Sequence, residues 1–132
     1  MALSYDSVNT LLDELLKLHP KKIDLSLDRS FNLLKKLGDP QNKISNIIHI
    51  AGTNGKFSTL NFIKSILKNN QKSINAYISP HLIYFNERFE IQDQIISNDQ
   101  LYQILSEVKN INNKDPITFF EITSAAFFKL AA

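Results

Sequence analysis

The chain of 132 residues has no cysteine and only three glycines. Without cysteine it forms neither a disulfide nor a thiolate metal site, a composition that fits the cytoplasm, where we expect the protein to be. No apolar run approaches the roughly 20 residues of a membrane span. The first residues also lack the basic flank and apolar stretch of a secretory signal. We therefore expect no membrane partner.

An excess of charge of one sign is also missing. Fifteen basic residues face thirteen acidic ones, for a net charge of +2, and the lysines are scattered singly or in short pairs. So weak and mixed a charge is not the footprint of a nucleic-acid-binding protein, and we expect no such partner. With 43% hydrophobic residues, the chain has the length and the apolar content of one domain.

Two of the three glycines lie in one turn, after the β-branched apolar run of residues 47–50. Gly52 and Gly55 allow backbone N–H groups to approach an anion closely, and Lys56 adds a positive charge where a helix is expected to begin. A strand, a glycine turn and a helix in this order indicate a phosphate-binding loop for ATP. The predicted nucleotide-binding residues are Gly52, Thr53, Asn54, Gly55, Lys56, Ser58 and Thr59.

Lys56 is the predicted catalytic residue, because its charge would neutralise the β- and γ-phosphates as the γ-phosphoryl group moves. The general pattern G-x-x-x-x-G-K-[ST] is not met, since Ile50 and Phe57 stand at its first and last positions. The alternative is an ordinary β–α turn with a solvated lysine. For the hydroxyls of Ser58 and Thr59, hydrogen bonding at the helix start is an equal alternative to ligand contact.

Hydrophobic periodicity and capping residues predict an α/β fold. The order strand, loop, helix, strand predicts a parallel pair with a right-handed crossover, with its ligand site at the carboxyl ends of the strands. Residues 79–90 are expected to form a long structured loop, a feature that is often functional. The first predicted helix has Ser4 or Asp6 as its N-cap and an apolar stripe at Val8, Leu11, Leu12, Leu15 and Leu16. The other predicted helices cover about 27–37, 56–68 and 98–109, with a last one from 118. The predicted strands cover 45–50, 73–78, 89–91 and 94–96.

Several further motifs sharpen this interpretation. They are His49-Ile-Ala-Gly-Thr-Asn-Gly-Lys56, Tyr77-Ile-Ser-Pro-His-Leu-Ile-Tyr-Phe-Asn-Glu-Arg-Phe89, Ile96-Ser97, Thr118-Phe-Phe-Glu-Ile122 and, upstream, His19-Pro-Lys-Lys-Ile-Asp-Leu25. In this order and spacing they closely resemble the N-terminal part of the folylpolyglutamate synthase/dihydrofolate synthase family, which belongs to the Mur ligase superfamily. A peptidoglycan-type Mur ligase shares the glycine loop, but the Ser-Pro-His and Phe-Asn-Glu-Arg block argues against that alternative.

The resemblance implies a fold and a reaction. The fold would be a partial, truncated Mur ligase-like central domain, a P-loop parallel sheet with flanking helices. Residues 1–132 would be the N-terminal part of the ATP-binding ligase domain, without the rest of that domain and without the C-terminal domain. With ATP and Mg²⁺, the enzyme would join L-glutamate to dihydropteroate, or to (tetrahydro)folate polyglutamates, through an acyl phosphate. The full-length enzyme is expected to be a monomer.

The resemblance also implies site residues. Ser79 would be a magnesium ligand, completed by a carboxylate and a histidine from beyond this chain. Apart from the resemblance, the guanidinium group of Arg88 can bind a carboxylate bidentately, which suits a glutamate or glutamyl-tail substrate, and an ion pair with Glu87 or Glu121 is the open alternative. Phe120 would stack on a pterin ring, unless it belongs to the core. The substrate-binding residues implied in this way are Asp24, Leu27, Pro80, His81, Asn86, Arg88, Phe120 and Glu121.

Two positions depart from the family pattern. Phe57 follows the loop lysine where the family has a small residue, and Ser26 replaces a glycine. The phenylalanine would either crowd the phosphates or turn inward and pack. A nucleotide-binding module without catalysis is therefore the second hypothesis for this chain.

Overall fold

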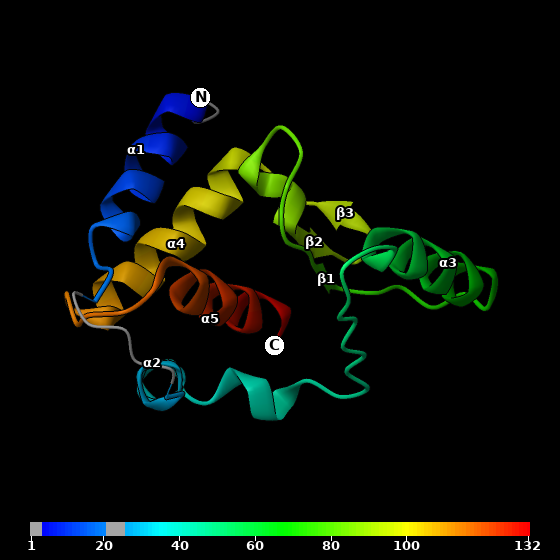
Figure 1. Ribbon diagram of the computed structural model, residues 1–132, viewed down its shortest axis with the longest axis horizontal. Helices are drawn as coiled ribbons and strands as arrows, with labels where there is room; N and C mark the ends of the chain where they lie inside the picture. Colours follow the sequence, from blue (N-terminus) through cyan, green and yellow to red (C-terminus); the bar gives the residue numbers. More distant parts are fainter. Residues whose placement is uncertain (1–3, 21–25) are drawn as a thin grey trace. The chain divides into compact units, whose positions relative to one another are not determined.

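The computed structural model describes residues 4–20 and 26–132 and combines helices with one small sheet (Figure 1). The chain divides into two compact units, Met1–Ile44 with Ser97–Ala132, and Ser45–Ile96. Among the described residues, none of the helices combines the length and the hydropathy that a membrane crossing needs.

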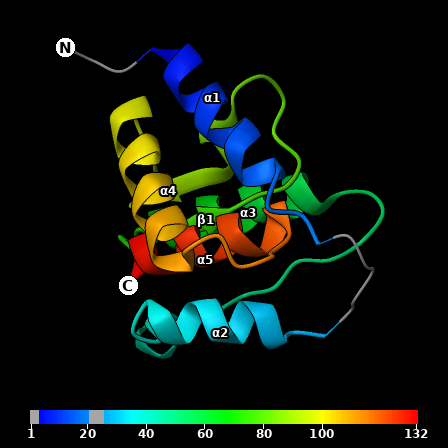
Figure 2. The same cartoon turned by 90° about the vertical axis from the view of Figure 1, so that its left-hand side faces the viewer.

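The first unit is helical. Helix α4 contacts α1 and α5, and α2 packs against α5 (Figure 2). Its elements are α1 (Tyr5–Leu16), α2 (Asp28–Lys36), the 3₁₀ turn η1 (Pro40–Lys43), α4 (Asn98–Asn112) and α5 (Phe119–Ala131). The apolar stripes of these helices meet in one core, because each helix must bury its stripe against another element. The most deeply buried side chains are Val8, Leu15, Leu33, Leu101, Leu105, Val108, Ile117 and Ile122.

Side-chain and backbone caps set the ends of these helices. Ser4 caps α1, while Ser97 with Gln100 and Thr118 with Glu121 form capping boxes on α4 and α5. At the end of α2, Gly38 has a φ of 82° and donates to the carbonyl of Lys35, while the next residue donates to Leu34. This is a Schellman motif, which glycine favours because it has no Cβ. The predicted helix starts and the predicted stop at Gly38 are confirmed.

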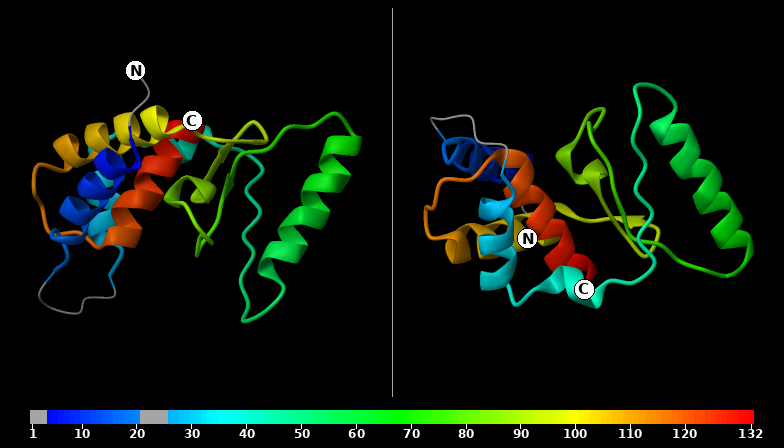
Figure 3. Two further views of the ribbon diagram at one scale, coloured as in Figure 1. Left: turned by 90° about the horizontal axis from the view of Figure 1, so that it is seen from above. Right: turned by 60° about the horizontal axis from the view of Figure 1, so that its bottom comes forward.

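The second unit holds the sheet. Its strands are antiparallel in the order β1-β2-β3, with Tyr77 opposite Phe89 and Glu90 opposite Ile95. Figure 3 shows this small sheet from two further directions. The elements are α3 (Lys56–Asn69), β1 (Ala76–Tyr77), the 3₁₀ turn η2 (Phe85–Arg88), β2 (Phe89–Ile91) and β3 (Gln94–Ile95). The predicted pairing of residues 89–91 with 94–96 is confirmed.

The predicted parallel pair is not formed. Residues 45–50 are not a strand, and the second strand shortens from 73–78 to β1. A strand needs a partner for its N–H and C=O groups, and residues 45–50 form no ladder with any described strand. Asn46 also interrupts the extended run with a φ of 57°. His49, which was expected to pack from this strand, is exposed.

Helix α3 has an apolar stripe but no buried residue. Phe57, Phe62 and Ile66 are each more than half exposed, while Leu60, Ile63 and Leu67 are half-buried. An ion pair between Lys64 and Glu90 connects the helix to β2. The predicted bounds and stripe of the helix are confirmed, and the described residues cover the stripe only in part.

Candidate functional site

The glycine loop brings unpartnered backbone N–H groups together at the start of α3. Gly55 is the N-cap residue with a φ of 77°, and Gly52 has a φ of 154°. Both values lie where a Cβ is disfavoured. Within residues 4–20 and 26–132, no side chain caps α3, and the first intrahelical bond of α3 runs from the N–H of Thr59 to the carbonyl of Gly55. The N–H groups of the first helical turn are therefore available to an anion, and the helix dipole favours one there.

The ammonium group of Lys56 lies over this loop. Its Nζ donates to the carbonyl oxygen of Gly52 at 2.5 Å and contacts that of Thr53 at 3.5 Å. An ammonium group has three donors, so it can hold the loop and still offer a donor to a phosphate. The charge and the free N–H groups therefore belong to one short segment, which fits the phosphates of a nucleotide.

The side chains after Lys56 behave differently from one another. The hydroxyl of Thr59 donates to the carbonyl of Gly55 at 2.9 Å, which is the helix-start role that the sequence left open. Phe57 is 57% exposed, so it does not turn inward to pack. Ser58 is exposed, and its ligand contact stays a prediction.

The segment after β1 is held by a carboxylate. Glu87 accepts hydrogen bonds from the backbone N–H groups of Leu82, Ile83 and Tyr84 at 2.7 to 2.9 Å. These bonds lower the pKa of Glu87, and the bond from Tyr84 has the largest effect. The buried Asn86 donates to the carbonyl of Ile96 at 3.0 Å. Both residues therefore fix the backbone in this structure, and the substrate contact of Asn86 stays a prediction.

Arg88 is paired differently from both ion pairs that the sequence left open. Its Nε donates to Nδ1 of His81 at 3.0 Å, and its guanidinium carbon lies 4.9 Å from the centre of the Phe85 ring. Glu87 is occupied by backbone N–H groups, and Glu121 pairs with Arg29 in the other unit. The suggested pairs with Glu87 or Glu121 are therefore wrong.

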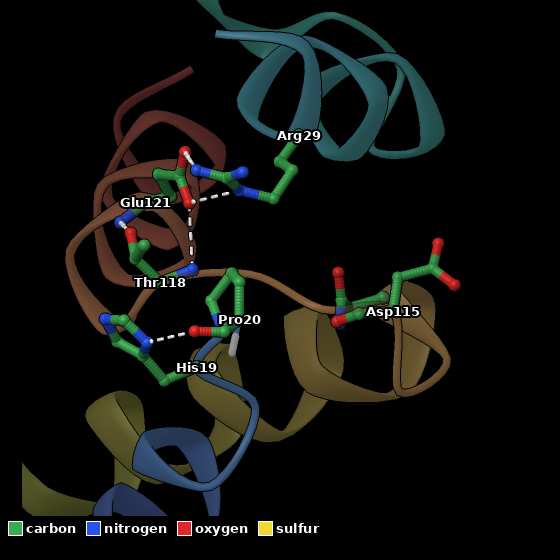
Figure 4. Close-up of polar contacts among 7 residues, drawn as sticks. His19, Pro20, Arg29, Asp115, Thr118 and Glu121 are labelled. Atoms are coloured by element: carbon green, nitrogen blue, oxygen red, sulfur yellow. Dashed lines mark hydrogen bonds and ion pairs between the residues drawn. The ribbon is translucent and has the colours of Figure 1, made fainter. Parts of the chain in front are cut away.

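Glu121 lies at the centre of a polar network in the first unit (Figure 4). Its carboxylate accepts from Nε and Nη2 of Arg29 at 3.2 and 3.3 Å and from the N–H of Thr118 at 2.8 Å. Burial would raise the pKa of Glu121, but the bonds from Thr118 and Arg29 outweigh it and hold that pKa below its ordinary value.

Arg29 is the residue that sequence reasoning missed. A cation in the first turn of a helix opposes the helix dipole, and Arg29 stands there in α2. That unfavourable placement was the signal for a specific anionic partner elsewhere in the chain.

The remaining predicted residues divide between the two units. Leu27 and Phe120 are exposed in the first unit, at 62% and 55%, so Phe120 is not a core residue. Ser79 and Pro80 are exposed in the second unit, joined by a cis peptide bond. Asp24 lies outside the described residues.

The predicted magnesium site is incomplete in the described residues. No group of three or more His, Cys, Asp or Glu side chains in that part of the chain could hold a metal ion. Mg²⁺ prefers several hard oxygen ligands, carboxylates among them, and a lone serine hydroxyl does not meet that need. Ser79 stays a predicted ligand, and no chemical step can be derived through a metal here.

The acid dependence of stability offers a test of the Glu121 network. We expect Glu121→Gln to flatten the fall in unfolding free energy between about pH 5 and about pH 3. The folded-state pKa of Glu121 is lowered, so its contribution is present above the ordinary glutamate pKa and is lost as pH falls through the folded value. Urea unfolding followed by circular dichroism at several pH values measures this.

The matched control is Glu107→Gln. Glu107 is an exposed glutamate of α4 in a loose 3.9 Å pair with Lys129, so this variant should keep the slope of the unmodified chain. Equal slopes for Glu121→Gln and the unmodified chain would contradict the role given to Glu121.

Comparisons with known proteins place this arrangement in a family. No protein-family model matches the chain. The chain is 34% identical over 119 residues to the dihydrofolate synthase/folylpolyglutamate synthase of Haemophilus influenzae, which covers 90% of this chain and 27% of the relative. It is 32% identical over 109 residues to the dihydrofolate synthetase of Saccharomyces cerevisiae, covering 81% of this chain and 25% of the relative. The chain thus spans about a quarter of the length of the curated relatives it matches.

Two solved structures share the fold. One is the bifunctional folylpolyglutamate synthase/dihydrofolate synthase of Yersinia pestis, complexed with AMPPNP and Mn, with a TM-score of 0.82, 26% identity and coverage of 97% of this chain and 30% of that one. The other is FolC of Escherichia coli in complex with DHPP and ADP, with a TM-score of 0.81, 30% identity and coverage of 93% and 30%. These structures confirm the α/β class. The chain belongs to the folylpolyglutamate synthase/dihydrofolate synthase family, and it corresponds to a part of the length of these relatives.

Proposed function

We propose that this chain is part of an ATP-dependent amide ligase that adds L-glutamate to dihydropteroate, to (tetrahydro)folate polyglutamates, or to both. The observation that carries the proposal is the glycine loop, where Lys56 and the free N–H groups of α3 come together. The names of the relatives support it, as do the nucleotides in the two solved structures. Both units would belong to the N-terminal part of the ATP-binding ligase domain.

The proposed reaction has two steps. A carboxylate oxygen of the pteroate or folate takes the γ-phosphoryl group of ATP, and ADP leaves. The amino group of glutamate then attacks the acyl carbon, an amide bond forms, and the bond from that carbon to the phosphate oxygen breaks. The amine loses a proton, and inorganic phosphate leaves. In the first step Lys56 would stabilise the charge on the moving phosphoryl group.

A divalent cation would accompany the nucleotide, as Mn does in the Yersinia pestis protein. We propose more specifically that this cation is Mg²⁺. The monomeric state and the cytoplasmic location also stay predictions, for sedimentation and cell fractionation to test.

An oxygen-transfer experiment tests the proposed reaction. The ligase of which this chain would be part is incubated with ATP, Mg²⁺, L-glutamate and dihydropteroate whose carboxylate carries ¹⁸O, and the released phosphate is analysed by mass spectrometry. The proposal expects one ¹⁸O atom per phosphate, because the second step leaves a carboxylate oxygen on phosphorus. ATP binding without substrate-dependent phosphate release would instead favour the non-catalytic nucleotide-binding module for this chain.

A further inference from the structure

The guanidinium group of Arg88 is held at one edge and on one face. Its Nε–H is used by Nδ1 of His81 at 3.0 Å, and the group lies over the ring of Phe85. Arginine has only donors, so Nδ1 of His81 must accept, which places the ring proton of a neutral histidine on Nε2. One histidine nitrogen therefore sets the orientation of the guanidinium plane.

Buried aromatic rings lie beneath Arg88. Phe85 and Phe89 are buried, with ring centres 6.0 Å apart, and the rings of His81 and Phe85 form a T-shaped pair with centres 5.5 Å apart. The carbonyl of Arg88 accepts from the N–H of Ile78 at 3.1 Å, which fixes the backbone of Arg88 beside the end of β1. An arginine held by its backbone, its Nε and one face loses little further freedom on binding a ligand.

Glu87, the nearest carboxylate in sequence, does not compete for this arginine. Both of its oxygens accept backbone N–H groups from the preceding segment. The positive charge of Arg88 is thus not neutralised by its neighbour. A cation that is oriented and half-buried, with its neighbouring carboxylate engaged elsewhere, suits an anion from outside the chain.

A carboxylate can bind an arginine in two bidentate ways, through Nε with one Nη or through both Nη groups. The hydrogen bond to His81 occupies Nε and therefore excludes the first of these two geometries. We propose that Arg88 binds a substrate carboxylate end-on, through Nη1 and Nη2, and that His81 is the positioning residue that selects this geometry. The identity of the carboxylate, L-glutamate or a glutamyl tail, rests on the proposed function; the end-on geometry does not.

The test follows the side-chain nitrogens of Arg88 by ¹H–¹⁵N NMR while glutarate is added to the 132-residue chain. The Nη signals of Arg88 should shift with saturation, and the Nε–H signal should stay in place. Glutaramide has the same length without charge, and it should shift neither. Arg88→Lys keeps the positive charge but lacks the two parallel N–H donors of a guanidinium group. It should bind glutarate about ten-fold more weakly, since a bidentate charged pair is lost.

Variants of His81 separate positioning from mere folding. His81→Ala frees Nε, so glutarate should now shift the Nε–H signal as well and bind about five-fold more weakly. His81→Asn offers a side-chain oxygen near the place of Nδ1 and should restore the pattern of the unmodified chain. His49→Ala removes an exposed histidine of the same unit and should change nothing.

Two results from these variants would overturn the inference. One is unchanged glutarate affinity and unchanged Arg88 signals in His81→Ala. The other is glutarate binding by Arg88→Lys as tight as that of the unmodified chain. ATP binding, measured on the same samples, reports on the glycine loop separately. Glutarate binding without ATP binding would contradict the proposed function and leave this inference standing. ATP binding without glutarate binding would overturn this inference and leave the proposed function standing.

Discussion

Replacing Lys56 with alanine is expected to weaken ATP binding by at least about ten-fold, because hydrogen bonds to charged groups contribute about 1.5 to 3 kcal/mol. In the structure the Lys56 ammonium lies on the carbonyl oxygens of its own loop, beside the free N–H groups of α3. The backbone donors survive the substitution, so weak residual binding is expected. Isothermal titration calorimetry with Mg-ATP measures the effect.

Lys68→Ala is the matched control for this loss. Lys68 is an exposed lysine in the last turn of the same helix, so its removal changes the net charge equally without touching the loop. Lys68→Ala should bind ATP like the unmodified chain. Equal weakening in both variants would show that only net charge matters, and would contradict the specific role of Lys56.

Phe89→Ala is expected to destabilise the second unit by about 3 to 5 kcal/mol, the usual cost of removing a buried phenylalanine. Phe89 is fully buried, and its ring lies 5.3 Å from that of Tyr77 and 6.0 Å from that of Phe85. The cavity would open beneath the segment that carries His81 and Arg88.

Amide hydrogen exchange measures this loss where it occurs. The N–H groups of Ile78 and Ile96 donate to the carbonyls of Arg88 and Phe89. Both should exchange about a hundred-fold faster or more in Phe89→Ala, since about 1.4 kcal/mol corresponds to a factor of ten. Phe62→Ala makes the same chemical change at a position that is 69% exposed, and it should leave both rates nearly unchanged. Equal effects of the two variants would mean that Phe89 does not hold this unit together.

The helices could be predicted from the sequence because their signals are local. Ser97, Thr118 and Gly38 act within a few residues of themselves, through caps and turns. The glycine loop was predictable for the same reason, since Gly52, Gly55 and the N-terminus of α3 are neighbours in the chain.

The strands and the long-range pairs could not be predicted in this way. Residues 45–50 have the composition of a strand, but a strand depends on a ladder partner, and none of the described strands pairs with them. Arg29 and Glu121 are 92 residues apart, and only the packing of α2 on α5 brings them together. The partner of Arg88 could not be predicted either. The sequence suggested a carboxylate, but in the folded chain the acceptor is a ring nitrogen of His81.

The central claim is that the glycine loop binds the phosphates of ATP. Backbone ¹H–¹⁵N spectra of the labelled chain, recorded as Mg-ATP is added, test it most directly, with AMP as the control that lacks the outer phosphates. Our account predicts that the largest ATP-induced shifts fall within residues 52–59 and that AMP shifts these signals much less. Saturating ATP that leaves residues 52–59 unmoved, or that moves only signals elsewhere, would contradict the account.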